Sequence, residues 1–261
     1  VKRDLFGMAT TMILAMLAAA PGARGDYCNI PRVDGKGIDY EDWKATISKK
    51  PVILTGLTDG WSALEKWEKE EFSRNYGHLK LPRSSSTGVH FNLPNVGDVI
   101  NLSTYLRHSD RQHFIIYDHA ETVEIMNAIR EDYQLPSILQ TASFETILSF
   151  GGAPQGATFQ RHQVAWLATI FGRKHWWMAD PRLEKPPEPR CYSHEGDDAH
   201  GKEFWDKYGV VHCTVMPGEI IWVPSQWWHA TCNGAPYTVA LGGQQYVPNR
   251  DSVATASGAL P

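Results

Sequence analysis

The sequence predicts a mainly β fold, a sandwich or barrel, preceded by a mixed segment of helices and strands in the N-terminal third. Short stretches rich in β-branched and aromatic residues crowd the C-terminal half, and Pro-Gly and Gly-Gly turns separate them. Few helical patterns lie between these stretches. With 261 residues, 42% of them hydrophobic, the chain is long enough for one domain with a real core and short appendages.

In the N-terminal third, the β-branched run 51–57 predicts a strand that the turn residues 58–60 close. Ser62 and Glu65 form a capping box, which predicts a helix that ends near Gly77. Further helices are expected at 40–48, 102–108 and 123–131, and further strands at 89–93, 114–117 and 146–150.

In the C-terminal half, strands are expected at 157–163, 165–171, 175–179, 212–216, 219–223 and 237–246. The interval 180–211 combines a Pro-rich stretch with a patch of histidines and acids from His194 to His200. This composition predicts a long insertion between two strands, with one helical turn near 204–208.

The start of the chain has the pattern of a targeting segment. Basic residues at 2–3 precede an apolar run at 8–20, and a small-residue site follows at 23–25. The run has about a dozen apolar residues, whereas a membrane span needs about twenty, and no other stretch approaches that length. We expect a cleaved signal peptide at 1–25, with an uncleaved signal anchor as the alternative. The expected location is the secretory pathway, in the endoplasmic reticulum lumen.

The cysteines fit that location. Cys28, Cys191, Cys213 and Cys232 all follow the expected signal peptide, and no C-x-x-C pair is present to hold zinc. Four cysteines allow three pairings, and an oxidising compartment predicts at least one disulfide. Asn101, followed by Leu and Ser, forms a glycosylation sequon.

The charge distribution excludes one class of partner. The formal net charge is −4, and the body of the chain contains no run of Lys and Arg. A groove for nucleic acid needs a basic stripe or patch, so we expect no nucleic-acid partner.

Two segments say most about function. Residues 172–177 form a tight turn that places a lysine and two tryptophans on a strand. The Pro-Gly-Glu turn at 217–219 leads into an apolar strand at 220–223, and Trp-Trp-His-Ala follows at 227–230. A lysine that points into a barrel, together with a histidine from a later strand, suits the binding of a small dicarboxylate beside a metal.

These segments resemble the jumonji-C (JmjC) branch of the cupin superfamily, the iron(II)/2-oxoglutarate oxygenases. The resemblance runs from about Pro51 to Tyr246 and is greatest to small lumenal members made of a signal segment and one such domain. It implies a double-stranded β-helix, mainly β with flanking helices. The expected organisation is a signal peptide at 1–25, a lead-in segment at 26–50, a JmjC/cupin-like domain at 51–248 and a tail at 249–261.

The resemblance also implies a metal site, in which a His-x-Asp/Glu pair and a later histidine hold iron. His229 matches the later histidine. The family spacing places the first ligand at Gln160 and the second at His162, where lumenal relatives carry His-x-His. In the alternative register His162 comes first and Val164 second, which supplies no second ligand. Neither register contains a carboxylate.

The missing carboxylate changes the charge of the site. Two imidazoles and an amide oxygen leave a metal dication with a net charge near +2, and an uncompensated charge in a dry barrel costs several kcal/mol. The 2-oxoglutarate dianion can neutralise it. We therefore expect weak iron affinity, and Asp118 and Asp198 stay open as substitute ligands. No catalytic residue is expected beyond the metal site.

Lys174 matches the basic residue with which the family pairs the far carboxylate of 2-oxoglutarate; the alternative role is a surface lysine that covers apolar residues. Thr158 lies close to where relatives place a hydroxyl on the same carboxylate. Lumenal relatives carry cysteines at positions matching Cys28 and Cys213, which implies a disulfide between these two. Cys191 and Cys232 then either pair or stay free.

Two functions follow from these expectations. The first is an iron(II)/2-oxoglutarate-dependent hydroxylase of a protein or peptide in the secretory pathway, with an atypical metal site. The second is a catalytically inactive cupin-fold protein that uses the same pocket, or its surface, for binding or regulation. The fold alone does not choose between them.

Overall fold

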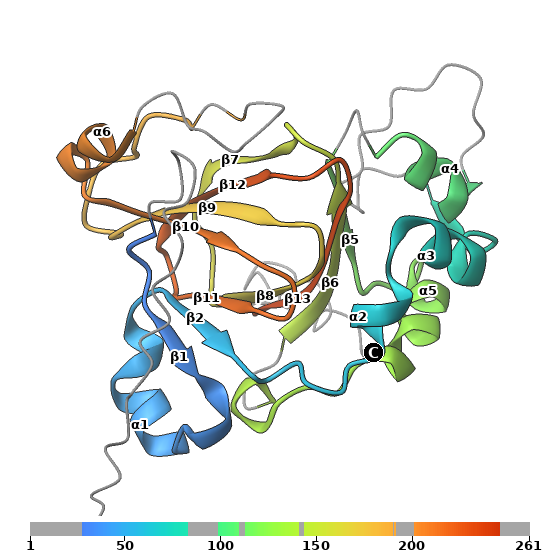
Figure 1. The fold of residues 1–261 in the computed structure, drawn as a ribbon, viewed down its shortest axis with the longest axis horizontal. Coiled ribbons are helices and arrows are strands. Elements are labelled where there is room, and N and C mark those ends of the chain that lie inside the picture. Colours follow the sequence, from blue (N-terminus) through green and yellow to red (C-terminus); the bar gives the residue numbers. More distant parts are fainter. Residues whose placement is uncertain are drawn as a thin grey trace, which may run out of the picture.

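The computed structural model describes residues 28–82, 99–109, 113–140, 144–189, 191 and 201–245, and its centre is a barrel of two facing sheets (Figure 1). The larger sheet has the strand order β1-β2-β11-β8-β13-β6-β5, and the smaller sheet has the order β10-β9-β12-β7. The bounds in the larger sheet are β1 (Arg32–Asp34), β2 (Val52–Thr55), β11 (Ile220–Val223), β8 (Ala165–Phe171), β13 (Thr238–Gln245), β6 (Phe144–Gly151) and β5 (His113–Tyr117). Those in the smaller sheet are β10 (Val210–Val215), β9 (Lys174–Ala179), β12 (Trp228–Asn233) and β7 (Gly156–Gln160), and β3 (Lys80–Pro82) pairs separately with β4 (Val99–Asn101).

The strands wind back and forth between the two sheets. From β7 onward the chain enters the smaller sheet, crosses to β8 in the larger one and returns to β9, and it repeats this exchange with β10 to β13. Gly172 makes the turn from β8 to β9 with φ of 78°, and a Cβ there would lie 2.4 Å from the Tyr237 carbonyl oxygen. Only glycine fits such a turn. The winding confirms the predicted double-stranded β-helix, mainly β with flanking helices.

Most of the helices pack against the larger sheet, and the last one packs against the smaller sheet. The helices are α1 (Tyr40–Ala45), α2 (Ala63–Lys66), α3 (Lys69–Tyr76), α4 (Leu102–Arg107), α5 (Val123–Ile129) and α6 (Gly201–Lys207). Phe114 of β5 and Leu148 and Phe150 of β6 are buried in one core with α2 to α5, on the right of Figure 1. Since side chains alternate along a strand, Ile147 and Ser149 face the barrel instead. None of the helices in the described part of the chain is long and apolar enough to cross a membrane.

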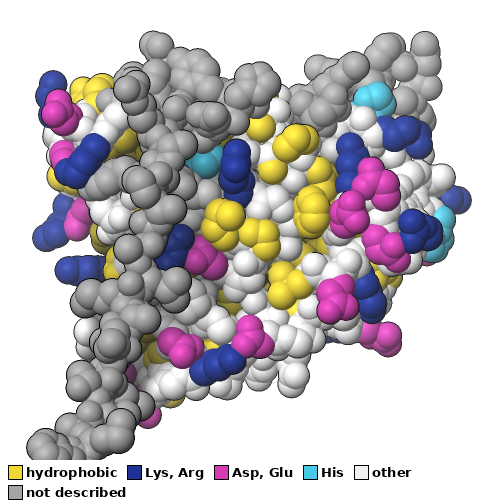
Figure 2. Space-filling model, in the orientation of Figure 1, with side chains coloured by type: hydrophobic (Ala, Val, Ile, Leu, Met, Phe, Trp, Pro, Cys, Tyr) yellow, Lys and Arg dark blue, Asp and Glu magenta, His cyan; other side chains and the backbone are white. Residues whose placement is uncertain are grey.

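The surface mixes both signs of charge. Figure 2 shows acidic and basic side chains close together on one face of the molecule, with hydrophobic side chains gathered between them in the middle.

One helix differs from its prediction. The helix expected at 62–77 is two helices, α2 and α3, with Trp67 between them. The predicted capping box is wrong, because the Ser62 hydroxyl donates to Asp132 Oδ1 at 2.9 Å and caps no backbone N–H. Asp132 is buried and also accepts from Trp67 Nε1 at 2.9 Å and from the Tyr76 hydroxyl. A tertiary carboxylate therefore outcompetes the local cap and fixes the break between the helices.

Other boundaries shift as well. Strand β7 ends at Gln160 instead of 163, and β12 was not among the expected strands. Arg32–Asp34, inside the expected lead-in, pairs in parallel with β2 and forms an edge of the larger sheet. The strand expected at 89–93 and the patch from His194 to His200 lie outside the described residues, as do the expected signal peptide and tail.

Two disulfides join distant parts of the chain. Cys28 is bonded to Cys213 with a Cα separation of 4.2 Å, and Cys191 to Cys232 with a separation of 5.7 Å. The first bond connects the residues before β1 to β10, and it spans 185 positions of sequence. Arg32 lies beside it, with its guanidinium 3.0 Å from Cys28 Sγ and 2.7 Å from Glu219 Oε1.

We predict that Asp132→Ala lowers the free energy of unfolding by about 3 kcal/mol or more. The substitution leaves several donors to Asp132 without an acceptor, and unpaired buried polar groups are among the costliest losses of folding free energy. Burial raises the pKa of Asp132, but hydrogen bonds from Lys66, Tyr76 and Trp67 outweigh it and lower the pKa overall. The contribution of Asp132 is therefore present above the pKa of an ordinary Asp and is lost only as the pH falls through the lower, folded value.

Urea titrations at neutral and acidic pH measure this effect, with the exposed Asp59→Ala as the matched control. Equal unfolding midpoints for Asp132→Ala and the control would contradict the structural role of Asp132.

We predict that replacing both Cys28 and Cys213 by Ser destabilises the protein more than replacing both Cys191 and Cys232. In the chain-entropy model the longer loop is worth roughly 5 kcal/mol and the shorter loop roughly 4 kcal/mol. Denaturant unfolding of the two double variants tests the order. Mass spectrometry of unreduced protein that finds Cys28 as a free thiol would refute the first bond outright.

Candidate functional site

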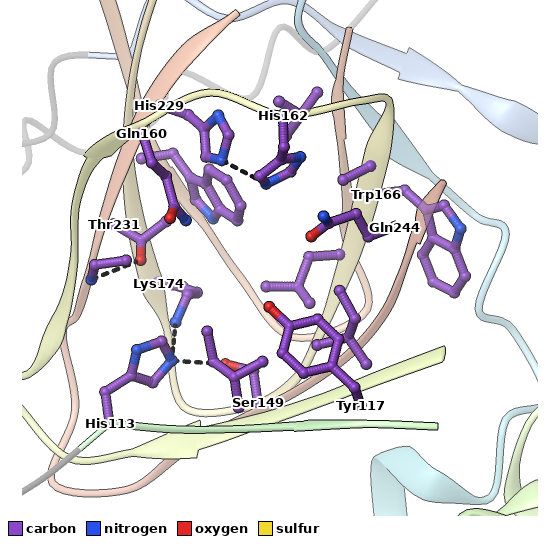
Figure 3. Close-up of a pocket in the computed structure, with 17 residues that line it drawn as sticks. His113, Tyr117, Ser149, Gln160, His162, Trp166, Lys174, His229, Thr231 and Gln244 are labelled. Atoms are coloured by element: carbon purple, nitrogen blue, oxygen red, sulfur yellow. Dashed lines mark hydrogen bonds between the residues drawn. The ribbon is translucent and has the colours of Figure 1, made fainter. Parts of the chain in front are cut away.

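The barrel encloses a cavity of about 70 Å³ between the two sheets. Its polar lining residues, labelled in Figure 3, are His113, Tyr117, Ser149, Gln160, His162, Lys174, His229, Thr231 and Gln244. Apolar side chains from β5, β6, β7, β8, β9 and β11 form the remaining wall. No Asp or Glu is among the described residues that line the cavity, and Lys174 is the one Lys or Arg among them.

A β-bulge decides which residues of β7 face the cavity. His229 of β12 is opposite Gln160 and Thr231 is opposite Ala157, so two residues of β7 lie across from one residue of β12. The extra residue reverses the alternation, and Ala157 and Gln160 both line the cavity. Phe159 instead packs outward against the core around α6, and Thr158 is exposed.

The structure therefore does not place Thr158 where it was predicted to bind the cosubstrate carboxylate. Thr158 is not among the cavity residues, because the bulge turns it toward solvent. The resemblance placed Thr158 close to the position of a hydroxyl in relatives, and a bulge of this kind cannot be seen in the sequence.

Two histidines converge at one end of the cavity. His162 Nε2 and His229 Nε2 lie 2.9 Å apart (Figure 3). His162 Nδ1 is 2.7 Å from the Gln163 carbonyl oxygen, and His229 Nδ1 is 2.9 Å from the Trp227 carbonyl oxygen. Since a carbonyl only accepts, both Nδ1 atoms donate, and in neutral rings both Nε2 atoms carry lone pairs.

Two lone pairs that face each other repel unless a shared proton or a metal cation lies between or beside them. Burial lowers the pKa of His229 to about 4 and also lowers the pKa of His162, so both rings are neutral near pH 7. Two metal–nitrogen bonds of about 2.1 Å at a right angle separate the nitrogens by about 3 Å. The separation in the structure matches that geometry, so the imidazole pair suits two neighbouring positions on one metal ion.

The third ligand position on such a metal ion has only a weak ligand. The Gln160 side chain points into the cavity from the same end of β7 (Figure 3). No group of three or more His, Cys, Asp or Glu side chains with metal-site geometry occurs within the described ranges. Asp118 lies outside the cavity lining with its carboxylate 3.8 Å from Arg130 Nη2, and Asp198 is not described. Val164 packs against the helix-covered core, so the alternative register adds no ligand.

The other end of the cavity is built around Lys174, which is 2% exposed. Its Nζ donates to Asn233 Oδ1 at 2.9 Å and lies 3.4 Å from His113 Nε2, which in turn is 2.8 Å from Ser149 Oγ. Burial lowers the pKa of Lys174 to about 7. Burial, followed by the neighbouring Lys174, holds the pKa of His113 well below its usual value. A buried cation without a carboxylate partner is a candidate anion site.

His113, Ser149 and Asn233 were not predicted from the sequence. Asn233 follows His229 on the same strand and is directly opposite Lys174, so strand pairing could have identified it. His113 and Ser149 come from β5 and β6, and no short-range signal links them to Lys174. Asn101 is exposed just before α4, where its sequon stays a prediction of glycosylation.

The closed double-stranded β-helix, with an imidazole pair and a buried lysine inside it, is the architecture of a cupin-like, JmjC-type protein. Sequence comparison agrees. The chain is 28% identical over 235 residues to the bifunctional arginine demethylase and lysyl-hydroxylase psr-1 of Caenorhabditis briggsae, covering 78% of this chain and 58% of the relative. It is 26% identical to lysine-specific demethylase JMJ21 of Arabidopsis thaliana, covering 83% and 25% of the two chains.

JmjC domain-containing protein 8 of Mus musculus is 25% identical over 193 residues, and the match covers 70% of each chain. Together these relatives make the chain a homologue of JmjC-domain proteins. The chain spans between a quarter and three-fifths of the length of the first two relatives. No model of a known protein family matches it. Among solved structures, Escherichia coli ycfD matches with a TM-score of 0.45 and 13% identity, covering 84% of this chain and 55% of that one.

We predict that Lys174→Met stabilises the protein at pH 6 by several kcal/mol. The pKa of Lys174 is about 7 in the folded protein against 10.5 in the unfolded chain, so the buried charge costs folding free energy. The gain is complete below pH 7 and disappears as the pH rises toward 10.5. Denaturant unfolding at several pH values measures it, and Lys44→Met, at an exposed position of α1, serves as control. A pH-independent gain would show that Lys174 is not a buried cation.

Proposed function

We propose that the protein is a JmjC-type 2-oxoglutarate oxygenase of the secretory pathway, which hydroxylates a protein or peptide through an atypical, weakly held metal. The observation that carries this proposal is the pairing of two sites in one cavity. Two imidazole lone pairs, 2.9 Å apart, face each other at one end, and the buried Lys174 occupies the other. In this proposal a dicarboxylate reaches from the lysine to a metal at the imidazole pair.

In this proposal the residues have distinct roles. His162 and His229 hold the metal, and Gln160 supplies a third, neutral oxygen. Lys174 pairs the far carboxylate of 2-oxoglutarate. When bound, iron(II) supplies the activation of oxygen that C–H hydroxylation requires. The carbonyls of Gln163 and Trp227 fix both imidazoles in the tautomer that presents Nε2.

The relatives support the chemistry and the type of substrate. One is named as an arginine demethylase and lysyl-hydroxylase, and others as lysine-specific or arginine-specific demethylases. Demethylases and hydroxylases of this kind modify protein side chains, which favours a protein or peptide partner here. The JmjC resemblance supports iron(II) and 2-oxoglutarate as the cofactors.

The location in the secretory pathway rests on different evidence. Both pairs of cysteines are joined in disulfides, and disulfides persist in oxidising compartments. The apolar run at 8–20 supports a signal segment. Expression of the full chain in a eukaryotic cell, followed by glycosidase digestion and N-terminal sequencing, tests the compartment, the sequon at Asn101 and signal cleavage together.

One observation favours the second function, a catalytically inactive binding or regulatory protein of the same compartment. The described cavity contains no carboxylate, so the donors around the metal position are all neutral. A dication there keeps its full charge until an anionic ligand arrives. Purified protein that binds 2-oxoglutarate but shows no turnover to succinate, with or without iron(II), would decide for this function.

We predict that Gln160→His increases iron(II) affinity by at least tenfold. An imidazole nitrogen is a much better ligand for such metals than a neutral amide oxygen, and the bulge points this position into the cavity. Thr158→His, which places the same side chain on the exposed face of β7, is the matched control. Calorimetric titration with iron(II) under anaerobic conditions measures both variants. Tight binding by the unaltered protein, unchanged in Gln160→Ala, would contradict the assignment of Gln160.

A further inference from the structure

One of the two disulfides lies beside a cation that is held in place. Arg32, the first residue of β1, has its Nη1 atom 3.0 Å from Cys28 Sγ and 3.4 Å from Cys213 Sγ. The other two nitrogens of the guanidinium donate to Glu219, Nε to Oε1 at 2.7 Å and Nη2 to Oε2 at 3.2 Å. Nη2 also donates to the Thr214 carbonyl oxygen at 2.9 Å. Because these acceptors hold Nε and Nη2, Nη1 stays directed at the two sulfurs.

The two sulfur atoms of this bond differ in their access to solvent. Cys28 is exposed, whereas Cys213 is 0% exposed and lies in the barrel core beside Trp176. A thiolate attacks one sulfur of a disulfide and expels the other, so access makes Cys28 Sγ the point of attack and Cys213 Sγ the leaving sulfur. A buried thiolate is costly unless a cation or a donor lies beside it. Arg32 Nη1 has that position.

The remaining polar groups around the bond weaken this effect but do not cancel it. The Thr214 carbonyl oxygen lies 3.6 Å from Cys213 Sγ, but it accepts from Arg32 Nη2. The Ile30 carbonyl oxygen lies 3.6 Å from Cys28 Sγ, which is the sulfur that does not become a thiolate. The Arg32 side chain is 38% exposed, so solvent screens its charge and we expect a moderate effect on rate.

Backbone contacts hold Cys28 in place when the disulfide is open. The residues before β1 run beside β10 (Figure 1), where Asn29 N donates to the His212 carbonyl oxygen at 3.0 Å and Asn29 Oδ1 accepts from His212 N at 2.7 Å. Ile30 is 3% exposed and packs in the barrel core with Cys213. A Cys28 that carries another thiol therefore stays close to the Cys213 thiolate, which can attack it and restore the bond.

We propose that the bond between Cys28 and Cys213 is a thiol–disulfide exchange site, at which a small thiol is joined to Cys28 and Arg32 stabilises the departing Cys213 thiolate. The incoming thiol loses its proton to water, and its sulfur forms a new S–S bond with Cys28 Sγ. The bond between Cys28 and Cys213 breaks, and its electron pair goes to Cys213 Sγ. One disulfide replaces another, so no oxidant or reductant is consumed. The inference goes beyond the proposed function and uses neither the metal nor the cavity.

Peptide mass spectrometry of the oxidised full chain measures the exchange. The protein is mixed at pH 7.5 with reduced glutathione, which is anionic, or in a parallel series with the uncharged 2-mercaptoethanol, and samples are quenched with acid over time. We expect the first thiol adduct on Cys28, together with a free thiol at Cys213. A first adduct on Cys213, or a bond that stays intact, overturns the proposal.

Two variants test Arg32. Arg32→Gln removes the charge and should slow the exchange by about threefold, the effect of a partly exposed ion pair. Arg32→Lys keeps a charge without the planar fork and should give an intermediate rate. If Arg32 only fastened the residues before β1 to the barrel, its loss would loosen them and speed the exchange. The sign of the change therefore separates stabilisation of the thiolate from packing.

The bond between Cys191 and Cys232 is a reference within the same molecule. Its polar neighbour among the described residues is the Thr231 carbonyl oxygen, 4.0 Å from Cys191 Sγ. Arg32→Gln should therefore leave the exchange rate of this bond unchanged. A parallel change at both bonds would report a general loosening of the protein and would overturn the proposal. Lys44→Gln, at an exposed position of α1, is the control for the loss of one positive charge.

The outcomes are distinct. Slower exchange of Arg32→Gln with both thiols supports the proposal. Slower exchange with glutathione alone shows that Arg32 only attracts an anionic thiol, and unchanged or faster exchange shows that it only packs. Either of these results overturns the role of Arg32 at the exchange site.

Discussion

The pairing of β9 with β12 is the contact on which the site depends. These neighbouring strands place Lys174 opposite Asn233 at one end and Met178 opposite His229 at the other. The two ends are four residue steps apart along the strand, roughly 13 Å of backbone. The cation and the imidazole pair therefore sit at fixed positions along one antiparallel ladder, and the larger sheet closes the cavity above them. A shift of one residue in this register would turn the side chains of one strand over, so that either Lys174 or His229 would leave the barrel interior.

The parts of the fold that follow from local patterns could be predicted from the sequence. Turn glycines and apolar strands predicted a sandwich or barrel, and the resemblance to JmjC proteins narrowed this to the double-stranded β-helix. The same resemblance selected His162, Lys174 and His229, which line one cavity. The wrong predictions, for Ser62 and Thr158, have their cause in contacts between residues far apart in the sequence. Ser62 bonds Asp132, 70 positions away, instead of its own helix. Thr158 faces solvent because a bulge, visible only in the pairing with β12, inverts the strand.

The contribution of His113 could not be predicted for a related reason. Its strand pairs with β6, and β6 pairs with β13, so His113 reaches Lys174 only when the barrel closes. The cavity that results carries one cation and no acid among its described lining. The protein folds in spite of this uncompensated buried cation, and a bound anion would neutralise it. A binding site differs from a core in keeping such an unpaired group.

The bond between Cys28 and Cys213 also constrains the order of events during synthesis. A ribosome releases the chain from its N-terminus, so Cys28 emerges before its partner, which follows 185 positions later. Cys191 pairs with Cys232, which is made after Cys213. Before Cys213 emerges, Cys191 has already been made, and a bond between Cys28 and Cys191 would be a mispairing. The maturing chain therefore needs either a delay in oxidation or an isomerase that corrects an early mispairing.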